Sequence, residues 1–454
     1  MFSSVIRLGD LDYIAPSQAC IKPILDQQKE DAARKRFLLE GGGGGGTVHI
    51  RGKGDDMPPP APRPIKITLA DCLACNGCVT TAEEILIEQQ KPSEVMATVA
   101  RIKELKDGTP TIASISPQSV ASLCVQFRDA SPLHTFQKLR YFFTKIVGLQ
   151  HVVSTRWAEG VSRREVCVEF NARRSSGLLP MLISACPGFV CYVEKSHPNM
   201  IPHLSTTMSP QAIMGVALSH AFGPTLYHVS IQPCFDRKLE ASRAEHCANT
   251  HCVLSSIEVF EWVKRLEVVW SDLPTLGPTV KMETVVETAI PRACPHQGSG
   301  AYHQSVLLAQ NIAGSIVYTP KRNANHCDVS LPGAPKASIM YGFQHIQNLS
   351  RTMKKKSSVE RNLPEIIEVM ACPGGCTNGG AQGRPRGVAE DNAGLLKAVN
   401  GVFEDWNGGT EVEEGGELIV VNGLNFHTTF TDRSQTSVAS EDIPDVMKLH
   451  ALKW

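Results

Sequence analysis

The chain has 454 residues, of which 45 are Lys or Arg, 45 are Asp or Glu, and 42% are hydrophobic. This length predicts about two or three domains with ample material for a buried core. The balanced charge excludes a chain that is disordered throughout, and it provides no overall basic field for binding nucleic acid. Phe, Trp and Tyr make up only 6% of the residues, which also disfavours a surface that stacks on bases.

The start of the chain carries no recognisable targeting segment. Its first residues, MFSSVIRLGDLDYI, include Asp10 and Asp12 and lack a long apolar run, so we expect neither a signal peptide nor a transit peptide. The uncharged run between Arg174 and Glu194 is interrupted by Pro180 and further helix breakers, which disfavours a membrane-spanning helix. We therefore expect a soluble intracellular protein without a membrane partner.

The next feature along the chain is a low-complexity stretch. Six consecutive glycines occupy positions 41–46, and MPPPAPRP follows at 57–64. Glycine runs are flexible, whereas proline runs are stiffer. We interpret about 27–65 as a mobile loop or insertion that acts as a spacer and carries no chemistry.

From about residue 110 the pattern changes to alternating strands and helices. Thr111–Ser116 is predicted to be a short strand, and apolar residues at near-helical spacing between Leu133 and Ile146 predict a helix. Three later apolar runs, LPMLISAC, LYHVSIQPC and EIIEVMAC, are predicted to be strands that end at cysteines. Ligands of open parallel sheets lie beyond the carboxyl ends of the strands. We therefore predict that three cysteines converge on one ligand: Cys186, Cys234 and Cys372.

The chain holds 15 cysteines, an odd number in a protein too large to need disulfides, so metal or cluster ligation in a reducing compartment is the better interpretation. The two-residue gaps between Cys72, Cys75 and Cys78 let a tight loop direct three thiolates at one iron–sulfur cluster, with a fourth ligand from elsewhere. Cys20, which lies in ACIKP, is a reasonable remote fourth ligand. Zinc is the alternative metal, but zinc sites usually pair two Cys-x-x-Cys hooks, and the sequence has no second hook.

A second group contains four cysteines. Its most specific part is the run Cys-Pro-Gly-Gly-Cys, in which the two glycines let the backbone approach a bulky inorganic ligand. Four thiolates suit one [4Fe–4S] cluster held between strand ends. The alternative is that these are buried structural thiols, which are common among single cysteines. The members of this group are Cys186, Cys234, Cys372 and Cys376.

The other cysteines are expected to pack in the core, because free cysteine is among the residue types most often buried. The pairs His246-Cys247 and His251-Cys252 contain residue types that bind zinc and could mimic a small zinc hook, but no second half-site accompanies them. The seven cysteines of this set are Cys124, Cys167, Cys191, Cys247, Cys252, Cys294 and Cys327.

Three segments around the second group resemble the signature segments of the iron-only hydrogenase large subunit: ISACPGF, IQPCFDRKLEASR and MACPGGCTNGGAQ. Two segments around the first group, LDYIAPSQACIKP and LADCLACNGCVT, resemble a narrower set. This set is the iron-only hydrogenase-like cytosolic iron–sulfur assembly factors of the nuclear prelamin A recognition factor-like family. The resemblance covers essentially the whole chain apart from the insertion at 27–65.

The resemblance implies an α/β fold like that of the iron-only hydrogenase large subunit, in which two α/β lobes enclose a cluster. The expected parts are an N-terminal iron–sulfur segment at 1–108, a first lobe at 109–290, and a second lobe with a C-terminal tail at 291–454. The resemblance also implies two [4Fe–4S] clusters. The ligands of the first would be Cys20, Cys72, Cys75 and Cys78, and those of the second Cys186, Cys234, Cys372 and Cys376.

The family acts late in cytosolic iron–sulfur protein assembly. The resemblance therefore implies a cytoplasmic protein, with a nuclear pool left open, that links an early scaffold to the targeting complex and its WD-repeat adaptor. The terminal segment Leu452–Trp454 could anchor in a partner pocket through Trp454, although Lys453 replaces the acidic residue usual in such tails. Neither nucleic acid nor a membrane is an expected partner.

Some positions depart from true hydrogenases, so the resemblance implies an assembly factor without hydrogenase activity. Ala185 stands where hydrogenases carry a proton-delivering cysteine, and Arg237 stands where a lysine contacts the di-iron ligands. The alternative is a hydrogen-converting enzyme with a di-iron subsite on Cys376. Lys238 and Glu240 keep that alternative open, unless they are only a solvated or lobe-bridging charge cluster.

Overall fold

The computed structural model describes residues 87, 89–106, 108–244, 246–283, 301–321, 323–355, 363–383, 392–408, 417–421 and 423–433. All of them belong to the second of the chain's two units, Ile85–Trp454. The predicted insertion at 27–65, the first group of cysteines with Cys20, Cys294 and the tail Leu452–Trp454 lie outside the described residues. Among the described helices, none is long and apolar enough to cross a membrane.

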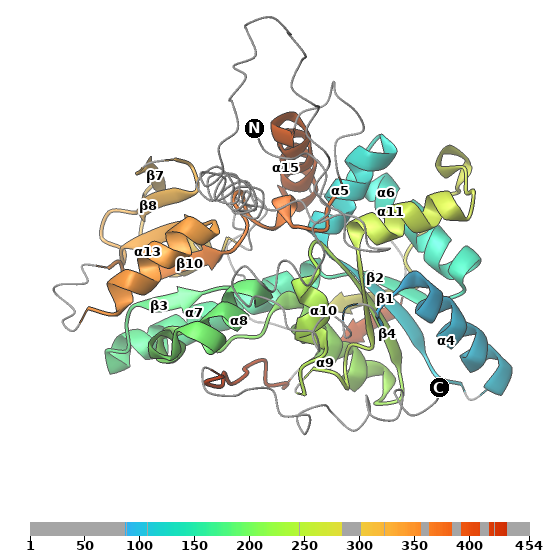
Figure 1. Cartoon of the computed structure of the whole chain (residues 1–454), viewed down its shortest axis with the longest axis horizontal. Helices are drawn as coiled ribbons and strands as arrows, with labels where there is room; N and C mark the ends of the chain where they lie inside the picture. Colours follow the sequence, from blue (N-terminus) through green and yellow to red (C-terminus); the bar gives the residue numbers. More distant parts are fainter. Residues whose placement is uncertain are drawn as a thin grey trace, which may run out of the picture. The chain divides into compact units, whose positions relative to one another are not determined.

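A parallel sheet with the strand order β2-β1-β4-β5 forms one layer of the fold (Figure 1). Every residue of β1 and β4 is buried, which is typical of a parallel sheet that is covered on both faces. Ala113 of β1 pairs with Val152 of β2 and with Val229 of β4. The strand predicted at Thr111–Ser116 is confirmed as β1. The strands are β1 (Thr111–Ile115), β2 (His151–Ser154), β4 (Tyr227–Gln232) and β5 (Cys252–Ser255).

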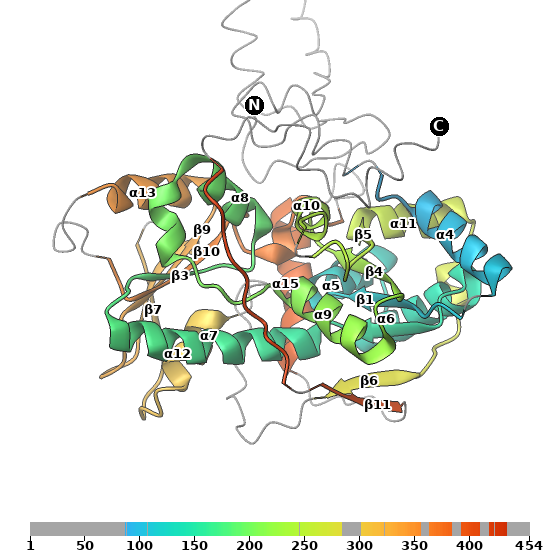
Figure 2. The ribbon, with the colours of Figure 1, turned by 90° about the horizontal axis from the view of Figure 1, so that it is seen from below.

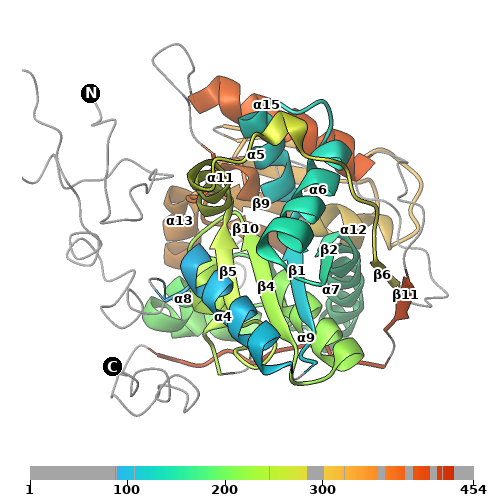
Figure 3. The same ribbon diagram turned by 90° about the vertical axis from the view of Figure 1, so that its right-hand side faces the viewer.

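Helices cover both faces of this first sheet (Figure 3). Ala113 packs in a core with α4, α5, α6 and α11, whereas its neighbour Ile112 packs with α7 and α9, because successive strand side chains point to opposite faces. The single helix predicted between Leu133 and Ile146 is α6 followed by a π-helical turn, Phe142–Val147. The helices are α4 (Pro92–Leu105), α5 (Pro117–Phe127), α6 (Pro132–Tyr141), α7 (Arg156–Ser176), α9 (Pro210–Phe222) and α11 (Ser256–Arg265).

A second sheet has the order β3-β10-β9-β8-β7, in which β3, β10 and β9 are parallel and β8 runs antiparallel to both of its neighbours, β9 and β7. Its core also takes up α7, α8, α12 and α13. β3 pairs with β10, so a strand from within the predicted 109–290 lobe belongs to the sheet built mostly from later residues. The division of the chain near residue 290 stays a prediction. The elements are β3 (Met181–Ile183), β7 (Val317–Pro320), β8 (His326–Ser330), β9 (Ala337–Tyr341), β10 (Ile366–Met370), α8 (Pro187–Ser196), α12 (Tyr302–Leu308) and α13 (Phe343–Met353).

Several helices begin with a proline that follows a polar residue. Ser116, Ser131 and Ser209 each accept a hydrogen bond from the backbone N–H three residues later, and a proline follows each serine. Cys186 holds the equivalent position before Pro187 at the start of α8. The proline that begins α8 therefore also places Cys186 at the N-terminus of this helix, where the helix dipole favours negative charge.

The remaining elements complete the described part of the fold. α15 packs on α5 through Val399, Phe403 and Ala121. The extended segment 423–433, which we call the C-terminal strap, runs past α8 and α7 (Figure 2). The other elements are α10 (Asp236–Ala241), α15 (Asn392–Gly408), β6 (Val280–Glu283), β11 (Glu417–Val420) and the 3-10 turns Pro198–His203, Trp270–Asp272 and Cys376–Asn378.

Candidate metal centre

The second group of cysteines lies at the carboxyl ends of strands from both sheets. Cys234 follows β4 of the first sheet, whereas Cys186 and Cys372 follow β3 and β10 of the second. Cys376 begins the short 3-10 turn after β10. The strands predicted ahead of the three cysteines are confirmed. In this arrangement, loops from two sheets deliver sulfur atoms to one region, as the carboxyl ends of parallel strands do in other α/β folds.

Cys186 and Cys376 lie near enough to Cys234 and Cys372 for their charges to raise the pKa values of both of those thiols. Burial raises the pKa of Cys376 to about 12, and a charge on Cys186 raises it as well. Burial also raises the pKa values of Cys234 and Cys372 well above the ordinary value, and charges on Cys186 and Cys376 add to both effects. Neighbouring buried thiolates repel each other, so the free thiols stay protonated near neutral pH. A cationic metal centre would offset that repulsion.

The number of thiols in this group equals the number of thiolates that one iron–sulfur cluster usually binds. Among the residues that the structure describes, no group of three or more His, Cys, Asp or Glu side chains is placed to hold a single metal ion. A [4Fe–4S] cube takes one thiolate at each of four irons. Backbone N–H groups also favour the charged sulfur: those of Ala371 and Phe189 lower the pKa of Cys186, against the larger opposite effect of burial.

Glycines let the cysteine loops approach one another. Gly374 and Gly375, between Cys372 and Cys376, have φ angles of 75° and 76°, which side chains other than hydrogen rarely allow. Gly379 makes a closer approach, because a Cβ atom there would lie 2.3 Å from the carbonyl oxygen of Pro233. Gly379 belongs to the second glycine pair of the signature segment, but no local pattern in the sequence predicts its close approach to Pro233.

An ion pair lies beside the cysteines. The Nη1 atom of Arg237 is 2.7 Å from Oε2 of Glu240, and both residues are buried. Burial alone would raise the pKa of Glu240, but the charge of Arg237 lowers it. Burial raises the pKa of Glu159, whose carboxyl group accepts a hydrogen bond of 3.0 Å from Gln118. Arg237 and Glu240 are therefore charged, whereas burial favours the neutral form of Glu159.

Lys238 belongs to a different network, although it follows Arg237 directly. Its Nζ atom donates hydrogen bonds to the carbonyl oxygen of Gln90 at 2.6 Å and to Glu258 at 2.7 Å, and its side chain is fully buried. Lys238 and Glu240 thus lie in two separate buried ion pairs. The interpretation of these residues as a solvated charge cluster is wrong, because helix α10 points them to different partners inside the fold.

Two small cavities adjoin the cysteines, and Ala185 lines both of them. The first is also lined by Cys376 and Arg237, and the second by Cys186 and by Phe430 of the C-terminal strap. Each has room for about one or two water molecules. Because alanine occupies position 185, no thiol from this position enters either cavity.

The C-terminal strap is fixed by backbone hydrogen bonds on both sides of the second cavity. Thr428 donates its N–H to Thr206 at 2.8 Å, and Met208 donates to Phe426 at 2.8 Å. Farther along, Arg433 donates its N–H to the carbonyl oxygen of Glu194 on α8 at 2.9 Å. The strap therefore forms part of the wall of the cavity that Cys186 also lines.

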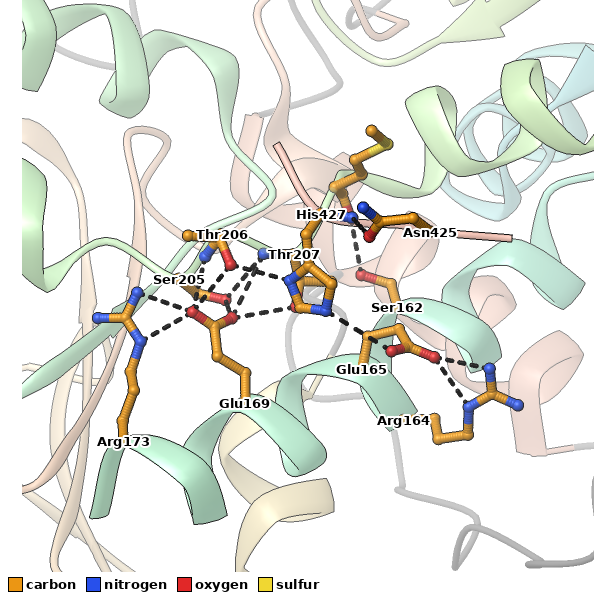
Figure 4. Close-up of polar contacts among 11 residues, drawn as sticks. Ser162, Arg164, Glu165, Glu169, Arg173, Ser205, Thr206, Thr207, Asn425 and His427 are labelled. Atoms are coloured by element: carbon orange, nitrogen blue, oxygen red, sulfur yellow. Dashed lines mark hydrogen bonds and ion pairs between the residues drawn. The ribbon is translucent and has the colours of Figure 1, made fainter. Parts of the chain in front are cut away.

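Glu169 on α7 organises the loop on which the strap rests (Figure 4). It accepts hydrogen bonds from the Ser205 hydroxyl at 2.6 Å and the Thr206 N–H at 2.9 Å, and it pairs with Arg173 at 2.7 Å. Thr206 in turn contacts Nδ1 of His427 in the strap at 2.8 Å. Burial would raise the pKa of Glu169, but these hydrogen bonds and the Arg173 charge lower it.

Replacing Glu169 by glutamine should destabilise the protein by about 3 kcal/mol at neutral pH, because the buried Arg173 loses its counter-charge. The folded-state pKa of Glu169 lies below its ordinary value. The stabilisation that ionised Glu169 gives to the folded state is therefore complete above the ordinary carboxyl pKa. It is lost as the pH falls through the folded-state pKa of Glu169. Urea unfolding of both proteins at pH 7 and at about pH 3.5 measures this difference. A gap between the curves that does not narrow in acid would contradict the assignment.

The other cysteines mostly pack as expected. Four of the seven are buried, while Cys191 and Cys247 are half-buried. The Nδ1 atom of His251 accepts a hydrogen bond from the backbone N–H of His228 at 3.2 Å, so this ring nitrogen has a partner within the first sheet. The four buried cysteines are Cys124, Cys167, Cys252 and Cys327.

The model of the iron-only hydrogenase large subunit, C-terminal domain, matches residues 109–380. Cytosolic iron-sulfur assembly component 3 of Mus musculus is 37% identical over 84% of this chain and 84% of its own length. Cytosolic Fe-S cluster assembly factor narfl of Xenopus tropicalis is 36% identical over 88% of each chain. Protein NAR1 of Arabidopsis thaliana is 32% identical over 85% of this chain and 84% of its own.

The chain belongs to the NARFL/NAR1 family of iron-only hydrogenase-like proteins. A solved [FeFe]-hydrogenase matches this NARFL/NAR1-family chain with a TM-score of 0.54 and 18% identity, over 79% of this chain and 94% of its own. A variant of HydA1 from Chlamydomonas reinhardtii matches with a TM-score of 0.55 and 17% identity, over 80% and 94%. The expected hydrogenase-like α/β fold is confirmed. The family match includes all four cysteines of the second group and begins after Cys78.

Proposed function

We propose that this NARFL/NAR1-family protein is a cytosolic iron–sulfur assembly factor that binds two [4Fe–4S] clusters. It would link an early scaffold to the targeting complex, with its WD-repeat adaptor, that delivers clusters to apoproteins, and Leu452–Trp454 would contact that complex. The names of the relatives, cytosolic iron-sulfur assembly component 3 and cytosolic Fe-S cluster assembly factor, support the pathway and the cytosolic location. The proposed ligands are Cys20, Cys72, Cys75 and Cys78 for one cluster and Cys186, Cys234, Cys372 and Cys376 for the other.

The observation that carries the proposal is the convergence of four thiols from two sheets, of which Cys186 is buried and the other three are half-buried. Burial and mutual repulsion disfavour thiolates without a metal at this place. A bound metal centre would offset that repulsion. A bound cluster would supply one-electron redox chemistry or a transferable iron–sulfur unit. The chain itself contributes the sulfur ligands, N–H groups that favour the thiolate at Cys186, and glycines that permit close approach.

Iron and sulfide analysis of anaerobically reconstituted protein tests this function. We expect about eight irons and about eight sulfides per chain, with a brown colour and low-temperature electron paramagnetic resonance signals of reduced clusters. About four irons or fewer after full reconstitution would contradict the two-cluster form. A colourless, redox-silent protein that contains zinc would contradict the proposal as a whole.

The hydrogenase-like fold favours one other candidate, a hydrogen-converting enzyme. The first cavity, beside Cys376, has room for about one or two water molecules, and Ala185 provides no thiol for proton delivery. We therefore expect no hydrogen-dependent dye reduction and no infrared bands of bound carbon monoxide or cyanide after co-expression with hydrogenase maturation proteins. Either signal would favour the enzyme instead.

A further inference from the structure

Arg237 has an unused hydrogen-bond donor beside the cysteine ligands. It lies in the first turn of α10, three residues after Cys234, and the residue is only 5% exposed. Its Nη1 atom is held by Glu240, whereas the described residues offer no hydrogen-bond partner to its Nε atom. The same side chain lines the first cavity together with Cys376. A buried guanidinium N–H without a partner is costly, so its position calls for an acceptor.

The charge of Arg237 acts on the sulfur atoms. Burial disfavours the charged guanidinium, but Glu240 and charges on Cys234 and Cys376 raise its pKa. In return, Arg237 lowers the pKa values of Cys186, Cys234 and Cys376, against the larger effect of burial. Glu240 is fixed on the other side of the guanidinium, where Gln211 also donates a hydrogen bond to it at 3.3 Å.

These contacts matter for a cluster because of its charge. A [4Fe–4S] core that is bound by four thiolates is an anion, and taking up one electron adds one more negative charge. Hydrogen bonds to the sulfurs and nearby charges set the reduction potential of such clusters. A permanent cation that cannot lose its proton stabilises the reduced form more than the oxidised form.

We propose that Arg237 is a positioning and tuning residue, which stabilises the reduced state of the cluster between the two sheets through its charge and its free Nε–H. This inference rests on the proposed function, because it requires a cluster on the second group of cysteines. Glu240 and Gln211 hold the guanidinium in place. If the Arg237–Glu240 pair served only to fix α10, its loss would change stability and leave the reduction potential unchanged.

The test is a redox titration of the full-length, anaerobically reconstituted protein, followed by electron paramagnetic resonance. In Arg237→Met, the ratio of reduced to oxidised cluster at a fixed potential should fall about tenfold for one cluster, or about 59 mV for one electron. Arg237→Lys keeps the charge and should restore most of that ratio. Glu240→Gln leaves Arg237 uncompensated and should shift the ratio in the opposite direction. The cluster proposed on Cys20, Cys72, Cys75 and Cys78 serves as an internal reference that none of these variants moves.

Arg140→Met is the matched control, because it removes another buried arginine, on α6, whose Nη1 atom donates a hydrogen bond to the carbonyl oxygen of Leu276 at 2.7 Å and which lines neither cavity. Its titration should match that of the wild type. Full iron content with an unmoved potential in both Arg237→Met and Glu240→Gln would overturn the inference alone. If Arg237→Met fails to hold iron, the Glu240→Gln titration decides. About four irons or fewer in the wild type would instead contradict the two-cluster form of the proposed function.

Discussion

Replacing Cys376 by alanine should remove the cluster between the two sheets and leave the N-terminal cluster in place. The iron content should fall from about eight towards about four per chain, because the cube would lose the thiolate at one of its four irons. The loss of iron should be larger than for substitution of a solvent-exposed cysteine ligand, which water or another side chain can replace. The cavity beside Cys376 has room for about one or two water molecules and holds no spare thiol. Iron and sulfide analysis with electron paramagnetic resonance measures the result.

Cys191→Ala is the control for this substitution. Cys191 lies on α8, close in sequence to Cys186, but its sulfur faces Arg243, 3.8 Å from Nη2. It should keep the full iron content. Equal iron in the wild type and in Cys376→Ala would remove Cys376 from the ligand set, and a loss in Cys191→Ala as well would indicate general instability of the apoprotein.

Replacing Gly379 by alanine should have the second large effect. Its Cβ atom would lie 2.3 Å from the carbonyl oxygen of Pro233, which is backbone and cannot rotate away. The loop that carries Cys234 and the loop that carries Cys376 would have to separate. We expect a loss of about 3 kcal/mol in unfolding free energy of the apoprotein, measured in urea, and a reduced capacity to take up the second cluster.

Gly401→Ala is the matched control for Gly379→Ala. Gly401 lies in α15, and a Cβ atom there meets no other atom within 4 Å. Alanine should be neutral there or stabilise the helix by up to about 1 kcal/mol. Iron uptake and stability at wild-type levels in Gly379→Ala would show that the two cysteine loops do not need this close approach.

Local signals in the sequence predicted much of the fold around the site. The apolar runs before Cys186, Cys234 and Cys372 are strands, and the strand at Thr111–Ser116 is β1. The apolar runs before the cysteines and the Thr111–Ser116 segment were predictable because a buried strand is marked by the apolar composition of its own few residues. The placement of β3 in the second sheet has no such local signal, because the pairing of Met181–Ile183 with β10 joins residues far apart in the chain.

The site shows the same division between local and distant information. The identity of the cysteines follows from motifs, but the contact of Gly379 with Pro233 depends on two loops that meet only in the fold. Lys238 and Glu240 are near neighbours in sequence, and their charges suggested one cluster. The structure separates them. Lys238 pairs with Glu258 and donates a hydrogen bond to the carbonyl oxygen of Gln90, whereas Glu240 pairs with Arg237.

Diffraction from anaerobically grown crystals at wavelengths on either side of the iron absorption edge tests the central claim most directly. We expect an iron-specific anomalous peak, resolvable into about four irons, enclosed by sulfurs that come from both sheets. The four sulfurs should belong to Cys186, Cys234, Cys372 and Cys376. Reconstituted protein whose anomalous signal is absent from this region, or lies there without Cys234 of the first sheet as a ligand, would contradict the account.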